Sequence, residues 1–292
     1  MNGALAVTRY TLLELSRRRI LLVFFILGAL GIVVLGVGLK VLYSFASSQG
    51  GFGAPNTDPA AFNRYLELAF VNYVFSALGV FGLLIAFAIG MTAIYHDLES
   101  GAAVSIFAKP VSRFAFAAGK IGGAILALVV IVGLLAVETR VVMFLFGGGL
   151  EGSLTGEAAA VVGNTMVVML IVLALSTWMN NIVAAVVAFV YYNVITGVIA
   201  FVHKLFETGA ISNDVVKTIF DVLYWLVPHE LVSSAPGDLA RAQIALANAP
   251  SSDTTILGAI PSASGWGDIA WWALVVLFFA GMVYLAVRRR QV

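Results

Sequence analysis

Long apolar runs separated by shorter polar segments dominate the chain. The runs are Ile20–Tyr43, Leu68–Tyr95, Phe114–Phe146, Ala158–Val202 and Ile269–Val287. A helix that crosses a bilayer needs about 20 consecutive apolar residues, so each run predicts at least one membrane span. As a single helix Ala158–Val202 would reach roughly 68 Å, against a hydrocarbon core of about 30 Å. We therefore expect two spans there, folded back at Trp178–Asn181, and six spans in all.

Residues 2–19, before the first run, predict an N-terminal amphipathic elbow helix that lies in the headgroup layer. Apolar and small residues recur there at helical spacing, and Glu14 and Arg18 are placed to pair one turn apart. A frayed polar tail is the alternative interpretation. Residues 44–66 are rich in turn-forming residues, which predicts a loop.

Residues 203–267 form the longest polar region. Apolar positions from Val215 to Val227 share one helical face and end at Pro228, which predicts an interfacial or re-entrant helix instead of a seventh span. Gly237–Asn248 predicts a second short helix, and residues 250–267 a linker. The expectation is an extracytoplasmic helical segment between helices five and six.

Composition places the chain in one broad class. Hydrophobic residues make up 61% of its 292 positions and charged residues 11%, whereas soluble domains carry about 25% charged residues. The fold class predicted is an all-α integral membrane protein, a single transmembrane domain over 1–292. The chain has no cysteine, which excludes disulfides, a thiol nucleophile and a cysteine-ligated metal.

Charge placement predicts the orientation. With six spans, both termini share one side, and that side carries ten basic residues against five on the other. The ten are Arg9, Arg17, Arg18, Arg19, Lys109, Arg113, Lys120, Arg288, Arg289 and Arg290. Basic residues concentrate in cytoplasmic loops, so we expect both termini in the cytoplasm.

The stretch from His96 to Lys120 is the longest polar interruption expected on that side. Asp97, Glu99 and Ser100 can cap and charge the start of a short helix, which Pro110 ends. Ser112 is placed to cap the third span. A short helix with apolar and charged faces, held between two spans, is typical of a docking site for a soluble partner.

The same stretch resembles the ABC-2-type permeases, the membrane subunits of ATP-binding-cassette exporters. The residues that carry the resemblance are Asp97, Glu99, Gly101, Lys109, Pro110, Val111, Ser112, Arg113, Gly119 and Lys120. The resemblance implies an elbow helix, a prokaryotic cytoplasmic (inner) membrane, pairing with a second identical or related permease chain, and an ABC ATPase partner that binds ATP and Mg. It implies a cytoplasmic coupling loop over 96–113. The residues expected to serve coupling are Asp97, Glu99, Gly101, Val104, Phe107, Lys109, Pro110, Ser112, Arg113 and Lys120.

No motif for nucleotide binding or catalysis occurs in the chain. Gly119–Lys120 is followed by Ile121, so the glycine–lysine pair is not part of a phosphate-binding loop. None of the three histidines lies in a zinc-protease motif, and no nucleophile elbow occurs. His229 and Glu230 are compatible with a site, although a polar turn is the simpler interpretation. We expect no enzymatic activity, no cofactor or metal in this chain, membrane lipid as a partner, and no nucleic acid.

Other residues are candidates for a translocation path or for helix packing. Glu138 and Arg140 are charged within an apolar run, which often marks a transport path, but a position near the outer interface explains them equally. Tyr191, Tyr192 and Asn193 lie within the fifth span and either line a path or bond between helices. Gly119 and Gly123 belong to a face of small residues spaced by four, which lets another helix approach closely.

Two other functions remain open at this point. One is an ATP-independent transporter, which typically has inverted repeats and mid-membrane charges. The other is a non-transporting anchor that passes force or signals to an extracytoplasmic complex through residues 203–267. The apolar composition is compatible with lipid, drug-like, peptide, ion or polymer substrates.

Overall fold

A computed structural model describes residues 3–48, 59–95, 97, 112–146, 153–207, 213–246 and 263–289. The described residues form helices joined by turns, with no strand among them. Six of these helical stretches are long and apolar enough to cross a membrane. They are Arg19–Leu42, Ala61–Thr92, Arg113–Leu145, Thr155–Ser176, Asn181–Phe206 and Trp266–Arg289. The expected all-α fold with six candidate spans is confirmed.

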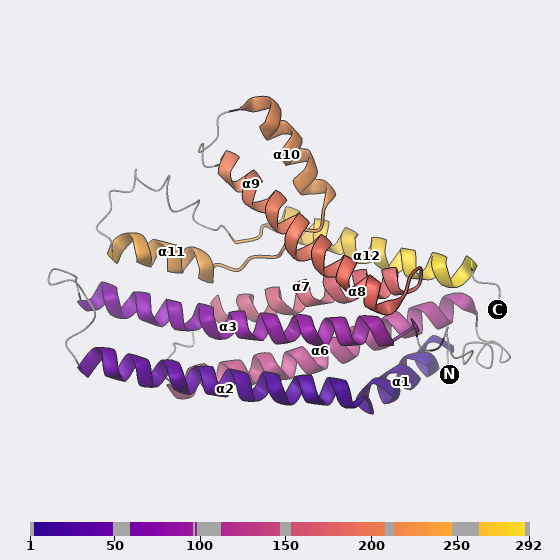
Figure 1. Ribbon diagram of the computed structural model, residues 1–292, viewed down its shortest axis with the longest axis horizontal. Helices are drawn as coiled ribbons and strands as arrows, with labels where there is room; N and C mark the ends of the chain where they lie inside the picture. Colours follow the sequence, from indigo (N-terminus) through magenta and orange to yellow (C-terminus); the bar gives the residue numbers. More distant parts are fainter. Residues whose placement is uncertain are drawn as a thin grey trace.

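Figure 1 shows the order of the elements, with most of the long helices along the long axis of the molecule. The first half contains α1 (Gly3–Ser16), α2 (Arg19–Ser48), α3 (Pro59–Thr92), α6 (Arg113–Phe146) and α7 (Ser153–Ser176). The fifth span is composed of α8 (Asn181–Phe189), a π-helical turn η1 (Val190–Thr196) and α9 (Gly197–Glu207). The remainder is α10 (Asp214–Leu226), α11 (Ala235–Leu246) and α12 (Trp266–Arg289).

The core lies where α3, α6 and α7 pack together, with α2 against α3 and α6, and α12 against α6 and α7. Leu78, Leu128 and Leu170, one from each central helix, are fully buried. The outward faces of the peripheral spans are apolar too: Ile182 is 68% exposed and Leu277 67%. Apolar residues on the outside of an apolar bundle are expected for a protein whose solvent is lipid.

The reversal between the fourth and fifth spans falls where the sequence predicts it. α7 ends at Ser176, and α8 begins at Asn181. Asn180 caps α8, since its Oδ1 accepts a hydrogen bond from the Ile182 amide at 2.9 Å. The cap satisfies an amide that the start of a helix leaves without an intrahelical partner.

Two predicted boundaries are wrong. The loop expected over 44–66 is misplaced at both ends, because α2 extends to Ser48 and α3 already begins at Pro59. Pro59 occupies the first helical position, where a missing amide hydrogen costs no hydrogen bond. The segment outside the spans was expected to begin at residue 203, but α9 continues through this position to Glu207. The helices expected near 215–227 and 237–248 correspond to α10 and α11.

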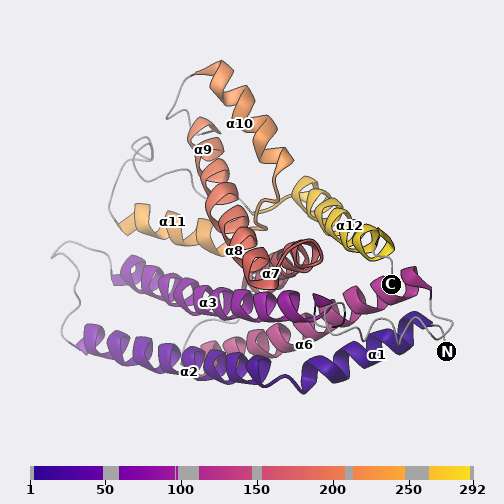
Figure 2. The ribbon, with the colours of Figure 1, turned by 45° about the vertical axis from the view of Figure 1, so that its right-hand side comes forward.

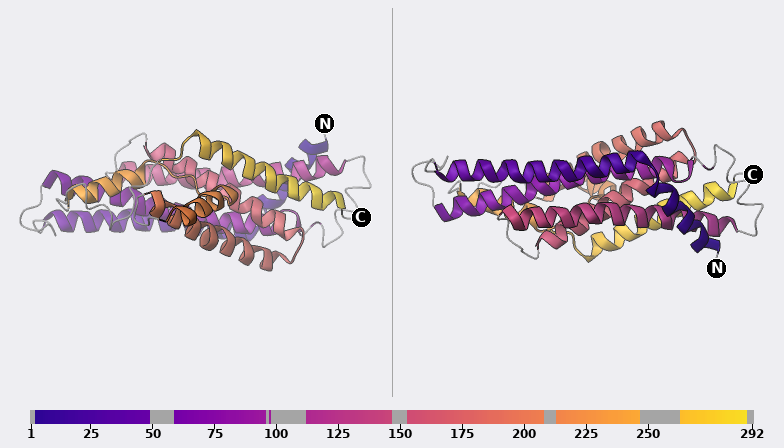
Figure 3. Two further views of the ribbon diagram at one scale, coloured as in Figure 1. Left: turned by 90° about the horizontal axis from the view of Figure 1, so that it is seen from above. Right: turned by 90° about the horizontal axis from the view of Figure 1, so that it is seen from below.

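α1 is a separate helix that lies across the beginning of α6 (Figure 3). It is joined to α2 through Arg17 and Arg18, and it lies at the same end of the bundle as the end of α12 (Figure 1). Val7, Thr11 and Leu15 form its buried face. Leu5 of the same helix is 62% exposed.

α9 and α10 pack against each other and lean away from α2, α3 and α6 (Figure 2). α10 begins at its cap Asn213, whose Oδ1 accepts from the Val216 amide at 3.2 Å. It ends just before Pro228, as the sequence predicts. α11 lies along α3.

Candidate functional site

A buried group of charges joins α1, α6 and the residues after α3. We call Glu14, Arg18, Asp97 and Lys120 the Lys120 cluster. Lys120 Nζ lies 2.5 Å from Asp97 Oδ2 and 3.0 Å from Glu14 Oε2. Arg18 Nη2 lies 2.5 Å from the other oxygen of Glu14, the pair that the sequence predicts. The Lys120 ammonium also lies over the Tyr10 ring, 5.0 Å from its centroid.

The cluster is balanced in charge, with two bases facing two acids. Lys120 is 0% exposed and Asp97 1% exposed. A buried charge is tolerated when partners replace the water it has lost. Burial by itself would raise the pKa of the Glu14 carboxyl, but the hydrogen bond from Arg18 and the charge of Lys120 outweigh burial and hold this pKa below its usual value.

Close packing of α1 on α6 places these charges next to one another. A Cβ atom at Gly119 would lie 2.6 Å from Val7 Cβ and 2.7 Å from the Ala4 carbonyl oxygen. One at Gly123 would lie 2.7 Å from Thr11 Cβ. The small-residue face that the sequence singles out is therefore the face that α1 contacts.

The described flanks of the expected coupling loop are held on both sides. Asp97 is held by Lys120, while Ser112 Oγ accepts from the Ala115 amide at 3.1 Å and caps α6. Arg113 Nη1 donates to the Arg288 carbonyl oxygen of α12 at 2.7 Å. The other expected coupling residues lie outside the described part of the chain: Glu99, Gly101, Val104, Phe107, Lys109 and Pro110.

The five candidate path residues do not come together. Glu138 is half-buried, and Arg140 is exposed and reaches Thr155 Oγ1 at 3.1 Å. Tyr191 packs partly buried against the core, and Asn193 Nδ2 donates within its own helix to the Phe189 carbonyl at 3.2 Å. Tyr192 differs, because it is 2% exposed and lines a cavity.

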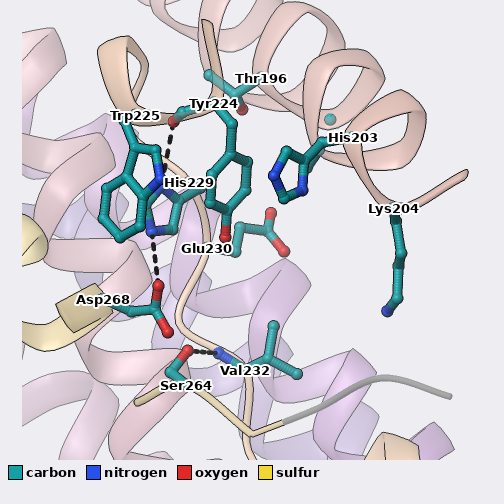
Figure 4. Close-up of a pocket in the computed structure, with 12 residues that line it drawn as sticks. Thr196, His203, Lys204, Tyr224, Trp225, His229, Glu230, Val232, Ser264 and Asp268 are labelled. Carbon is teal, nitrogen blue, oxygen red and sulfur yellow. Dashed lines mark hydrogen bonds and ion pairs between the residues drawn. The ribbon is translucent and has the colours of Figure 1, made fainter. Parts of the chain in front are cut away.

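A larger cavity of about 450 Å³ lies between α9, α10 and the start of α12. Figure 4 shows its aromatic wall, in which the Tyr224 ring lies between two histidine rings. The centroid of Tyr224 is 4.3 Å from that of His203 and 4.2 Å from that of His229, and both pairs are stacked. Each histidine meets an acid: His203 Nε2 lies 3.2 Å from Asp221, and His229 Nε2 lies 3.3 Å from Asp268.

Residues 229–233 separate this cavity from a smaller one of about 230 Å³. Asn164 of α7 holds the segment, since it accepts from the Leu231 amide at 2.8 Å and donates to the Leu231 carbonyl at 3.0 Å. Ser233 Oγ donates to Glu157 of the same helix. Glu230 lines both cavities.

Sequence reasoning missed both the Lys120 cluster and these cavities. His229, Glu230 and Tyr192 were the signals for the cavities, and nothing in the spacing joined them to one another or to Glu157 and His203. Among the described residues, no group of three or more acidic or histidine side chains could hold a metal ion. No protein-family model matches the chain, and no curated protein matches it.

Proposed function

We propose that this chain is the membrane subunit of an ATP-driven exporter of the ABC type, in which a separate ATPase docks between α3 and α6. The observation that supports the proposal most strongly is the anchoring of the described flanks of that segment. Asp97 is bound to Lys120, and Arg113 to the Arg288 carbonyl. A docking segment can move the spans only if its ends are fixed to them.

Through the Lys120 cluster, the docking segment would be coupled to α1 as well as to α6. Because Lys120 forms ion pairs with both Asp97 and Glu14, a displacement of the docking segment acts on α6 and α1 together. In the proposal α1 is the elbow helix, lying in the headgroup layer with Leu5 and Leu13 toward lipid, since they are 62% and 51% exposed. The transported molecule would cross where two such chains meet.

The basic end of the bundle would lie in the cytoplasm. One end of the bundle gathers basic residues from α1, the start of α2 and the link between them, the start of α6 and the end of α12: Arg9, Arg17–Arg19, Arg113 and Arg288–Arg289. Positive residues favour the cytoplasmic side, so that end would face the cytoplasm of a prokaryotic cell. α10 and α11 then form an extracytoplasmic segment.

The test is to co-express the chain with an ATPase encoded beside it in its genome and to purify both through a tag on this chain. We expect a complex of two copies of each protein that hydrolyses ATP in lipid nanodiscs. Glu99→Lys combined with Lys109→Glu, which keeps the net charge, should abolish the complex while leaving membrane insertion intact.

The matched control exchanges a charge pair on α11. Arg241 Nη1 lies 3.0 Å from Asp238 Oδ1 on the exposed surface. Asp238→Lys combined with Arg241→Glu should leave ATPase binding unchanged. The proposal would be refuted if both double variants bound the ATPase equally well. It would also be refuted if this chain alone moved a transported molecule across vesicle membranes.

A further inference from the structure

The smaller cavity contains a buried polar group that lacks a partner. Tyr192 belongs to the π-helical turn η1 and is 2% exposed, and its hydroxyl has no hydrogen-bond partner among the described residues. A buried hydroxyl left unpaired costs about 1 to 3 kcal/mol, so native structures rarely retain one without a reason. π-helical turns within spans are frequently found at functional sites.

The charges around this hydroxyl are of one sign. Glu157 and Glu230 line the cavity, and no lysine, arginine or histidine is among its described lining residues. Glu157 already accepts from Ser233, while Glu230 is exposed and lines both cavities. Two carboxylates that line one cavity, with no base among its described lining residues, favour a bound cation that restores the balance.

The shape and the remaining wall favour an organic cation over a bare metal ion. A volume of about 230 Å³ far exceeds an ion, and the described residues offer no group of three metal ligands. Phe75 and Tyr192 present aromatic rings to the same cavity. Aromatic faces attract quaternary ammonium groups, which carry positive charge on an apolar surface.

We propose that the cavity between α3, α7, η1 and residues 230–236 binds a small organic cation of the alkylammonium class. Glu230 and Glu157 balance its charge, Phe75 and Tyr192 contact its apolar surface, and the Tyr192 hydroxyl bonds a polar substituent. The inference depends on the cavity and not on coupling to an ATPase, so the isolated chain tests it. A failure to bind the cation would not contradict the proposed coupling to an ATPase, and a failure to bind an ATPase would not contradict the proposed cation site.

The probe is choline, which joins a quaternary ammonium to a hydroxyl, titrated calorimetrically into the purified chain in nanodiscs. Its comparison is the uncharged isostere in which carbon replaces the quaternary nitrogen. We expect one choline per chain and at least about tenfold weaker binding of the isostere. Equal binding of the two compounds, no choline binding, or binding of a divalent cation instead would overturn the proposal.

Variants then locate the site. Glu230→Gln and, independently, Glu157→Gln should each weaken choline binding at least about tenfold, and Tyr192→Phe by a smaller factor. The control is Glu67→Gln, which removes an exposed carboxylate of α3 away from the cavity and should bind as the natural chain does. Unchanged affinity in every correctly folded carboxylate variant would place choline elsewhere. The isostere comparison decides the charge requirement even if one variant does not fold.

Discussion

At the scale of single residues, Lys120 is the side chain on which most of the polar structure at its end of the bundle depends. It is 0% exposed and contacts Asp97, Glu14 and the Tyr10 ring. Lys120→Met keeps an unbranched side chain one atom shorter, removes the charge, and leaves two acids with Arg18 alone. Because one partner of a buried pair is lost, we expect the free energy of unfolding to fall by about 3 to 5 kcal/mol.

Thermal unfolding in detergent, followed by tryptophan fluorescence, measures this loss. Adding Asp97→Asn to Lys120→Met should cost less than the sum of the single variants, since the two residues share one interaction. Lys217→Met on the exposed face of α10 is the control and should change little. Equal effects of Lys120→Met and Lys217→Met would contradict a structural role for the cluster.

His229 carries the pH dependence at the other polar region. It is 6% exposed, and burial lowers the pKa of its imidazole, although the Tyr224 carbonyl and Asp268 oppose this shift. The unfolded state therefore binds the proton more readily than the folded state. Stability is lost as the pH falls through the window below the ordinary histidine value of about 6.5.

We expect acidification from about pH 7.5 to about pH 5 to loosen the stack of Tyr224 on His229. Trp225 meets the His229 ring edge-on at 5.5 Å, so its fluorescence reports the change. His229→Gln should abolish most of this response, whereas His96→Gln should retain it. A response that survives His229→Gln would mean that another group, and not His229, is responsible for it.

At the scale of elements, the seat of α1 on α6 depends on glycine. Gly119→Val would force its side chain against Val7 and the Ala4 carbonyl, so we expect α1 to be displaced. Thr11, which is 0% exposed, becomes the reporter as Thr11→Cys in a chain that has no other cysteine. A maleimide should label position 11 when Gly119→Val is also present, and hardly at all when Gly119 is retained.

Gly133→Val is the matched control, because Gly133 lies on the same helix with nothing within 4 Å of an added Cβ. It should leave position 11 protected. Labelling that rises equally in both valine variants would mean that a general loosening of α6, and not contact with α1, exposes the residue.

The elements show why sequence predicts some features and not others. Length and apolarity predicted the six candidate spans, and the fold at Asn180 followed because one helix of that length would exceed the bilayer. The ends of α3 and α9 were misplaced, because the ends of helices depend on local capping and on packing against neighbours. Pro59 was counted with the loop, although proline is also a favoured first residue of a helix.

At the scale of the whole molecule, what sequence could not predict is which distant residues meet. Glu14 and Lys120 are 106 positions apart, and Ser233 and Glu157 are 76 apart. Helical periodicity assigns residues to a face but not to the helix that covers that face. The small-residue face at Gly119 and Gly123 was therefore recognisable, while its partner α1 was not.

The arrangement of the whole bundle predicts its orientation in the membrane. Ser112 and Arg241 are both exposed, the first at the end of the bundle near α1 and the second on α11. If the basic end faces the cytoplasm, a membrane-impermeant maleimide applied to intact cells should label the Arg241→Cys variant and not the Ser112→Cys variant. Permeabilised cells should show both labelled, which controls for reactivity. The reverse pattern would place the expected docking segment outside the cell, where a cytoplasmic ATPase could not reach it. Labelling of position 241 alone would place that segment in the cytoplasm, as docking of an ATPase requires.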